Sequence, residues 1–267
     1  MIVRDWLLNA TWQLKAVGIE SAHLDAELLL SFVTRLDRAK LLAYPEQALD
    51  KAQLNRLARL LTRRLHREPL AYILHEKEFY GRIFYVNKHV LIPRAESEAF
   101  ISQLRSLTLT SGTQLIDIGT GSGCLAITAA LEFPDLRVEG WDIDTKTLSV
   151  ARKNARNLDA KVRFKHRDLR KSVSRKTADV VIANLPYVDP DWQHSPETAY
   201  EPAVALFAED HGLSLIKDLL TDSPLKKRGY LLLEADTRQH QELVTEATRH
   251  AFTLLGQEGL ILTFQLT

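Results

Sequence analysis

Residues 115–127 read LIDIGTGSGCLAI, and this stretch decides the fold. An apolar run typical of a buried strand leads into Gly119, Gly121 and Gly123, and a second apolar run of helical character follows. Glycine permits tight turns and close approach of a ligand to the backbone, and the start of the next helix offers free N–H groups. The spacing is Gly-x-Gly-x-Gly rather than the Gly-x-Gly-x-x-Gly of dinucleotide-binding folds. The stretch therefore predicts a strand–loop–helix unit, and by itself it identifies no ligand.

Strands and helices alternate on either side of this loop. We expect strands at 113–118, 136–141, 161–166, 178–183 and 229–235, and helices at 123–133, 145–158, 212–220 and 240–252. Such alternation is typical of an α/β fold in which helices cover both faces of a mostly parallel sheet. Residues 252–256 and 259–266 predict an antiparallel hairpin at the end of the chain.

The first third of the chain has a different pattern. Apolar residues recur there at helical spacing in three stripes, Gly18 is the only glycine, and Ser21 stands where it could cap the second helix. The stripes contain Trp6, Leu7, Leu14 and Val17; Leu24, Leu28, Leu29, Phe32 and Val33; and Leu54, Leu57, Leu61 and Leu65. We predict a helical domain over 1–75, a linker or β-hairpin over 76–98, and the α/β domain over 99–267.

Composition excludes several classes of protein. A formal net charge of +1 over 267 residues does not favour binding of polyanions by bulk charge. The single Cys124 excludes an internal disulfide and a cysteine zinc cluster, fits a reducing compartment, and leads us to predict no metal site. No apolar run reaches 18 residues, and the N-terminus, which contains Asp5, is a poor signal peptide. We therefore expect a cytoplasmic protein with no membrane partner.

Acidic residues follow the second and third strands of the expected sheet. Asp142 lies nineteen residues after Gly123, where a carboxylate can accept both ribose hydroxyls of an adenosine. Asp144 is the alternative, but it directly precedes a helix and suits the N-cap. Asp168 could accept the exocyclic amine of an adenine, or it could be a surface acid among cations.

Positive charge is concentrated in residues 152–176, which contain eleven Lys or Arg and two acids, Asp159 and Asp168. A solvated face is the simpler interpretation, and a patch for nucleic acid or an acidic partner is the alternative.

A second polar signal follows the fourth strand, where residues 184–187 read NLPY. Asn184 carries a carbonyl acceptor and an amide donor on a short side chain, and Tyr187 adds a flat amphipathic ring. Pro186 fixes its own φ and biases Leu185 toward an extended backbone. An ordinary loop after a strand is the alternative interpretation.

Taken together, these features resemble the S-adenosylmethionine-dependent methyltransferases. Nearly the whole chain is similar to the glutamine N5-methyltransferases that modify peptide-chain release factors. Five stretches match that family in order and spacing: REPLAYIL (67–74), EFYGRIFYVNKHVLIPRAESE (78–98), DIGTGSGCLAI (117–127), NLPY (184–187) and YEPAVALFAEDHGL (200–213). The chain departs from the family pattern at four places: His75 replaces a Gly, Ala95 and Leu185 each replace a Pro, and LLLEAD (231–236) replaces Glu-Ile-Gly.

The resemblance implies a Rossmann-like seven-stranded methyltransferase sheet and a small all-helical N-terminal bundle that recognises the substrate. It implies that S-adenosylmethionine is bound by Gly119, Thr120, Gly121, Ser122, Gly123, Asp142, Asp168 and Asn184. It also implies catalysis by residues 184–187. The Asn184 side-chain oxygen and the Leu185 carbonyl would accept the two N–H groups of a substrate amide, Pro186 would hold Leu185 extended, and Tyr187 would pack on that amide. The implied partners are class-1 release factors, modified at the glutamine of a Gly-Gly-Gln motif.

Three alternatives remain. A sister family methylates a glutamine of a large-subunit ribosomal protein and shares the NLPY-type loop. Adenine-N6 methyltransferases also resemble this loop, but they need a base-flipping apparatus and a target-recognition segment, which residues 1–75 do not indicate. We therefore do not expect nucleic acid as the substrate. A non-catalytic binding module is disfavoured because the glycine loop and Asn184, Pro186 and Tyr187 are all intact.

Overall fold

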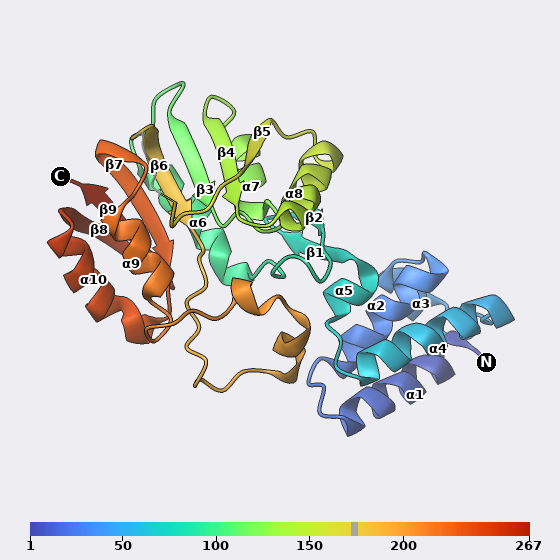
Figure 1. The fold of residues 1–267 in the computed structure, drawn as a ribbon. Helices are drawn as coiled ribbons and strands as arrows, with labels where there is room; N and C mark the ends of the chain where they lie inside the picture. The colour runs from blue at the N-terminus through green and yellow to red at the C-terminus, as the bar shows by residue number, and fades with distance from the viewer. Residues whose placement is uncertain (172–175) are drawn as a thin grey trace. The chain divides into compact units, whose positions relative to one another are not determined.

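The computed structural model describes residues 1–171 and 176–267, and its ribbon is drawn in Figure 1. The chain divides into two compact units. The first contains Met1–His75 together with Ser195–Tyr200, and the second contains Glu76–His194 and Glu201–Thr267. The sequence did not indicate that residues 195–200 group with the helical unit. Part of the basic 152–176 segment, residues 172–175, lies outside the described residues.

The helical unit contains α1 Val3–Ala16, α2 Ala22–Thr34, α3 Arg38–Ala43, α4 Lys51–Leu65, α5 Leu70–Leu74 and the 3₁₀ turn η2 Pro196–Tyr200. The three predicted apolar stripes lie on α1, α2 and α4. Their buried members include Leu14, Leu29 and Leu57, which pack into one core, whereas Val17 and Leu24 are exposed. The sequence missed α3 and α5, which are only six and five residues long.

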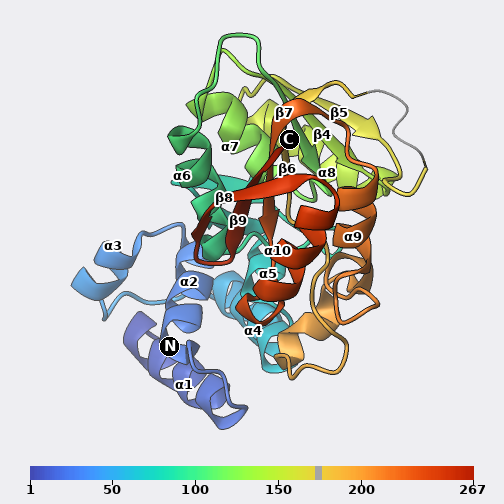
Figure 2. The same ribbon diagram turned by 90° about the vertical axis from the view of Figure 1, so that its left-hand side faces the viewer.

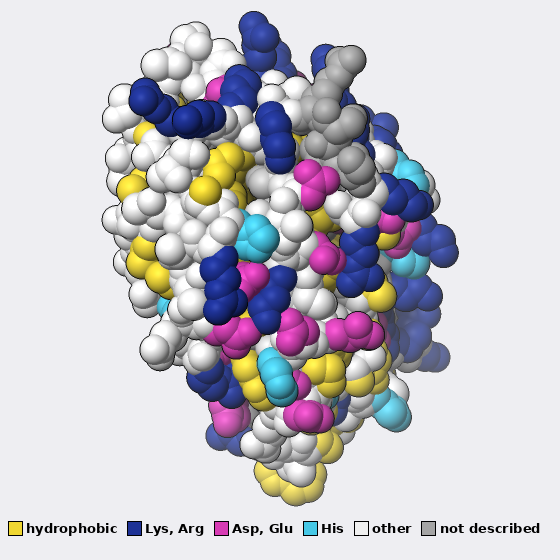
Figure 3. All heavy atoms as spheres, turned by 60° about the vertical axis from the view of Figure 1, so that its left-hand side comes forward, with side chains coloured by type: hydrophobic (Ala, Val, Ile, Leu, Met, Phe, Trp, Pro, Cys, Tyr) yellow, Lys and Arg dark blue, Asp and Glu magenta, His cyan; other side chains and the backbone are white. Residues whose placement is uncertain are grey.

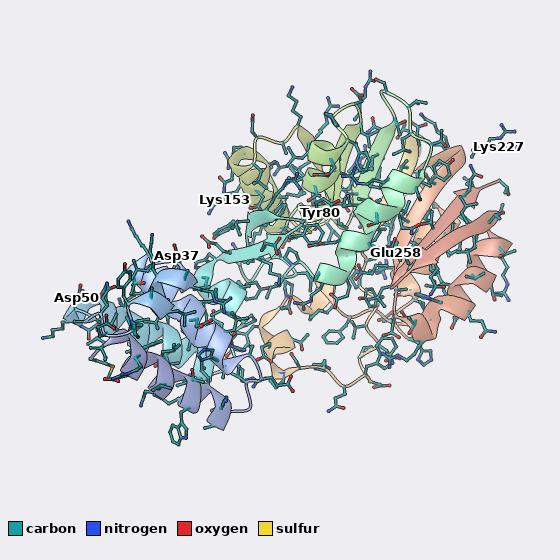
Figure 4. All side chains as sticks on the ribbon, turned by 180° about the vertical axis from the view of Figure 1, so that it is seen from behind. Asp37, Asp50, Tyr80, Lys153, Lys227 and Glu258 are labelled. Atoms are coloured by element: carbon teal, nitrogen blue, oxygen red, sulfur yellow. The ribbon has the colours of Figure 1, made fainter. Side chains whose placement is uncertain are left out.

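Two helices of this unit, α3 and α4, begin at an aspartate that caps the helix. Ser21 is the N-cap residue of α2, as predicted, but its side chain makes no capping hydrogen bond. Asp37 accepts from the backbone N of Lys40 at the start of α3. Asp50 and Gln53 form a reciprocal capping box at the start of α4. Figure 4 labels both aspartates.

The second unit is built on a seven-stranded sheet of order β5-β4-β3-β6-β7-β9-β8, which can be followed in Figure 1. The strands from β3 to β7 are parallel, and β9 is antiparallel to both β7 and β8. The structure thus confirms the mostly parallel sheet and the antiparallel end. The strands are β3 Gln114–Ile118, β4 Arg137–Asp142, β5 Val162–His166, β6 Ala178–Ala183, β7 Leu225–Glu234, β8 Phe252–Glu258 and β9 Ile261–Leu266.

Helices cover both faces of the sheet. They are α6 Ala99–Ser106, α7 Cys124–Glu132, α8 Thr145–Asn157, α9 Ser214–Thr221 and α10 His240–Arg249, with 3₁₀ turns η1 Ala95–Glu98, η3 Ala203–Ala205 and η4 Thr237–Gln239. Alternate residues of β3 separate the two cores: Ile116 packs with α9 and α10, and Leu115 packs with α6, α7 and α8. Figure 2 shows α9 and α10 on one side of the sheet and α6 and α7 on the other.

A two-stranded hairpin, β1 Glu76–Phe79 and β2 Arg82–Tyr85, precedes this sheet. Asn154 of α8 accepts from the backbone N of Tyr85 at 2.7 Å and donates to the Tyr85 and Ser122 carbonyls at 3.0 and 2.8 Å. The buried Asn154 side chain therefore joins the hairpin to the glycine loop.

The parallel strands place the residues that follow them at one edge of the sheet. Gly119, Asp142, Asp168 and Asn184 come at or just after the carboxyl ends of β3, β4, β5 and β6. Ligands of open α/β sheets bind at that edge. In the described part of the chain, no helix is long and apolar enough to cross a membrane.

Candidate active site

A cavity of about 560 Å³ lies at the carboxyl ends of the parallel strands. Its walls include most of the predicted site: Gly119, Thr120, Gly121, Ser122, Asp142, Asp168, Asn184, Leu185 and Pro186. Of the predicted residues, Gly123 and Tyr187 are not among the described residues that line it.

The glycine loop lies close to the end of the neighbouring strand. The backbone N–H groups of Gly119 and Thr120 both donate to the Trp141 carbonyl at 2.9 Å. Gly123 begins α7 with φ of +81°, and a Cβ there would lie 3.2 Å from the Cβ of Ala151. Glycine at this position therefore permits a left-handed turn and close packing of α7 against α8.

Asp142 is fixed beside this loop. Its Oδ2 accepts from the Gly121 N–H at 3.1 Å, and its Oδ1 accepts from the Asp144 N–H at 3.0 Å. Burial raises the pKa of Asp142, although these N–H groups oppose the shift. Asp144 has a different role, because its Oδ1 accepts from the Lys146 N–H at 2.8 Å and caps α8, as we predicted.

Asp117 is a buried acid that sequence reasoning missed. Its Oδ2 accepts from the Thr120 hydroxyl at 2.6 Å and from the Ala126 N–H at 3.2 Å. Its Oδ1 is buried and has no hydrogen-bond partner among the described residues. Burial raises the pKa of Asp117 to about 7. Two acids beside the loop, Asp117 and Asp142, are thus held where the ionised form is disfavoured, and a cationic ligand would stabilise both carboxylates.

The raised pKa of Asp117 predicts a pH dependence of stability. The folded state holds this proton up to about pH 7, whereas the unfolded chain loses it near pH 3.8. The contribution of this proton to the free energy of unfolding is therefore fully present below pH 3.8 and is lost as the pH rises through about 7. Asp117→Asn removes the titration. We expect the free energy of unfolding of the parent to fall, relative to the variant, by at most about 4 kcal/mol between pH 4 and 8. Urea unfolding of both proteins across this range is the measurement, and parallel pH profiles would contradict the prediction.

Asp168 reaches the cavity from the loop after β5. Its Oδ1 accepts from the Arg170 N–H at 3.0 Å, and the Lys171 ammonium lies 3.6 Å from its Oδ2. The basic segment around it is largely exposed, including Arg152, Lys161 and Arg163. Figure 3 shows Lys and Arg side chains gathered along the right-hand edge of one face. A solvated face and a partner patch both fit this exposure.

Asn184 belongs to a hydrogen-bond network. Its Nδ2 donates to the Ser97 hydroxyl at 3.0 Å, and Ser97 Oγ in turn donates to Glu234 Oε2 at 2.5 Å. Among residues 1–171 and 176–267, no donor reaches the side-chain oxygen of Asn184. The amide therefore turns its NH₂ group toward Ser97 and keeps its carbonyl oxygen available as an acceptor.

Tyr187 lies behind this network. Its hydroxyl donates to Glu234 Oε1 at 3.0 Å, its carbonyl accepts from Gln239 Nε2 at 2.8 Å, and its ring packs against the core of the sheet. Burial, followed by the charge of Glu234, raises the pKa of Tyr187. The expectation that its ring packs on the substrate amide finds no support in this arrangement.

Leu185, which departs from the family pattern, has a packing role. Its side chain is 6% exposed and belongs to the apolar cluster of α9 and α10. A Cβ on Gly119 would lie 3.1 Å from Leu185 Cδ2, so the glycine loop and the NLPY loop are in close contact. Leu185 thus fills core space and also lines the cavity together with its neighbours Asn184 and Pro186.

Known proteins match both units. Residues 5–74 match the family described as PrmC N-terminal domain, and residues 95–201 match the Methyltransferase small domain. The release factor glutamine methyltransferase of Koribacter versatilis is 38% identical over 233 residues, which cover 85% of this chain and 83% of the relative. The chain belongs to the release factor glutamine methyltransferase family. This confirms the resemblance seen in the sequence, and the protein is an S-adenosylmethionine-dependent methyltransferase.

Other members and neighbours agree. The release factor glutamine methyltransferase of Neisseria gonorrhoeae is 39% identical over 217 residues, 79% of each chain. A bifunctional methyltransferase of Rickettsia felis is 34% identical over 91% of this chain, which spans only 53% of that protein. A methyltransferase structure from Pyrococcus furiosus has a TM-score of 0.52 at 19% identity, covers 79% of this chain and 98% of its own, and supports the fold.

Proposed function

We propose that the protein methylates the side-chain N5 of the glutamine in the Gly-Gly-Gln motif of class-1 release factors. The observation that carries this proposal is the orientation of Asn184, whose carbonyl oxygen has no donor within the described chain and whose residue lines the cavity beside Leu185. An acceptor of this kind suits a substrate that presents N–H groups, as a primary amide does.

S-adenosylmethionine, when bound, supplies an electrophilic methyl group on a positively charged sulfonium. The residues of the cavity wall that would hold it are Gly119, Thr120, Gly121, Ser122, Asp142, Asp168 and Asn184, and Gly123 would support the loop from outside the wall. Asp142 lines the cavity, and burial raises its pKa, so a positively charged ligand there would stabilise its carboxylate; this supports a sulfonium cofactor in the cavity.

The acceptor site addresses a chemical difficulty. A primary amide nitrogen is a poor nucleophile because its lone pair is delocalised into the carbonyl. Acceptors aimed at both of its N–H groups would orient it and let it lose positive charge during transfer. We assign these roles to Asn184 Oδ1 and the backbone carbonyl of Leu185, with Pro186 holding Leu185 extended. No general base is required before transfer, since the methylated amide readily loses a proton to water.

Asp142 and Asp144 are the two candidates for the residue that binds the ribose of the cofactor, and substitution of each distinguishes them. Asp142→Ala is expected to weaken S-adenosylmethionine binding by about 1–3 kcal/mol, because it removes a bidentate acceptor and a support of the glycine loop. Asp144→Ala is the matched comparison, since Asp144 also lines the cavity but its side chain caps α8. Titration calorimetry gives both affinities, and the reverse order would assign the ribose to Asp144.

We assign recognition of the protein substrate to the helical unit, because a single glutamine offers too little surface for specificity. A chain lacking residues 1–75 should still bind S-adenosylmethionine and lose methylation of the intact protein substrate. Methylation of whole release factor at the normal rate by the truncated chain would refute the assignment.

The substrate itself is tested by mass spectrometry. Purified release factor, large-subunit ribosomal protein and DNA are each incubated with the enzyme and labelled S-adenosylmethionine. A single methyl group on the Gly-Gly-Gln glutamine, lost in Asn184→Ala, is the expected result. Label confined to the ribosomal protein, or to an adenine, would replace the proposal with that alternative.

A further inference from the structure

Two buried residues connect to Asn184 through hydrogen bonds, and one of them, Ser97, also lines the cavity. Ser97 lies in η1 and is 2% exposed, and Glu234 ends β7 and is 1% exposed. The hydrogen bonds run from Asn184 Nδ2 to Ser97 Oγ and from Ser97 Oγ to Glu234 Oε2. Glu234 is held on its other oxygen by the Tyr187 hydroxyl at 3.0 Å.

We propose that Ser97 and Glu234 are positioning residues that determine which end of the Asn184 amide faces the substrate. The inference rests on the proposed function, in which the Asn184 carbonyl accepts an N–H of the substrate amide.

The reason lies in the count of protons. The two ends of an asparagine amide have nearly the same shape, so packing alone does not select between them. A serine hydroxyl has one proton, and Ser97 uses it to donate a hydrogen bond to the Glu234 carboxylate. Ser97 Oγ can then only accept, and Asn184 must present its NH₂ group to it. The carbonyl is left for the substrate. A flipped amide would instead face the substrate N–H groups with N–H groups of its own.

The charge state of Glu234 controls the direction of these hydrogen bonds. A neutral Glu234 could donate to Ser97, which would release the serine proton toward Asn184 and favour the flipped amide. Burial raises the pKa of Glu234, while hydrogen bonds from Ser97, Tyr187 and Asn184 oppose the shift. The other titratable or charged groups near this network are Glu96, Cys124, Arg94 and Asp236. We therefore expect the rate to fall on the acid side as Glu234 takes up a proton.

The first test removes the central hydroxyl in the full chain. Ser97→Ala is expected to lower kcat for glutamine methylation about 10–100-fold, the loss found when the hydrogen-bond partner that orients a metal ligand is removed, with little change in S-adenosylmethionine affinity. Ser97→Thr, which restores a hydroxyl, should recover most of the rate. Ser223→Ala is the matched control, because Ser223 is also buried, at 4% exposure, but lies before β7, at the opposite end of that strand from Glu234.

A double-mutant cycle shows whether Ser97 acts through Asn184. In an Asn184→Ala background, Ser97→Ala should cause no further loss in single-turnover rate, since there is no amide left to orient. A full additional loss in that background would overturn the inference.

The pH profile of kcat separates orientation from general structural support. Glu234→Gln keeps an acceptor for Ser97 at every pH, so it should retain activity near neutrality and lose the acid-side fall. Glu96→Gln makes the same change on an exposed neighbour whose charge raises the pKa of Glu234, so it should keep the acid-side fall and move it to lower pH. An unchanged kcat in Ser97→Ala, or an acid-side fall that persists in Glu234→Gln, would refute the inference. If the parent enzyme methylates no glutamine at all, the proposed function fails first, and the inference with it.

Discussion

Asn184→Ala is expected to lower kcat for glutamine methylation by about 10²–10³-fold, the loss typical when one group of a preorganised electrostatic site is removed. The variant lacks the only side-chain acceptor that we assign to the substrate amide, and the Leu185 carbonyl alone cannot orient both N–H groups. Asn184 also lines the cofactor cavity, so S-adenosylmethionine affinity should fall as well, though less than the rate.

Single-turnover kinetics with labelled S-adenosylmethionine at saturating concentration isolate the chemical step from binding. Asn157→Ala provides a control, because Asn157 is an exposed asparagine at the end of α8. If Asn184→Ala kept a rate within a few-fold of the parent, binding of a substrate amide through residues 184–187 would be excluded.

Arg64→Ala is expected to lower the free energy of unfolding by about 3–5 kcal/mol, because it leaves the buried Asp25 carboxylate without its cation. Arg64 is 6% exposed, and it donates from Nε to Asp25 at 2.7 Å and from Nη1 to Glu197 at 3.0 Å. Arg67 adds a second hydrogen bond to Glu197, at 2.8 Å. All four residues belong to the helical unit.

The neighbouring Arg63 offers a matched control. It pairs with Glu68 nearer the surface, so Arg63→Ala should cost no more than about 1 kcal/mol. Chemical denaturation of the two full-length variants, monitored by circular dichroism at a wavelength where helices absorb, measures both losses in the free energy of unfolding. Equal losses in the two variants would show that the buried ion pairs contribute little.

The sequence was informative wherever a position follows from a local pattern. The places of Asp142 and Asn184 at the cavity could be predicted because a parallel sheet brings the ends of its strands to one edge, and the glycines at 119–123 mark a strand-to-helix turn. The alternation of elements likewise predicted the sheet and its antiparallel end.

The features that the sequence did not predict depend on contacts between residues far apart in the chain. Ser97 meets Glu234 across 137 positions of the chain, and Arg64 meets Glu197 across 133, so no local pattern reports either pair. Glu234 lies in LLLEAD (231–236), a stretch that departs from the family pattern, so the sequence did not identify Glu234 as a neighbour of Asn184. Ser21 shows the limit of local rules, because a residue type common at helix starts here makes no capping hydrogen bond.

The assignment of residues 195–200 to the helical unit bears on how this enzyme can be divided by recombination. The polypeptide passes between the two units three times, after residues 75, 194 and 200, so the helical unit is not a terminal module that could be exchanged as one continuous piece. A chimera that takes only the first 75 residues from a relative would exchange Arg64 and Arg67 but keep Glu197, the acid to which both donate. Domain exchange within this family should succeed more often when both segments are inherited together.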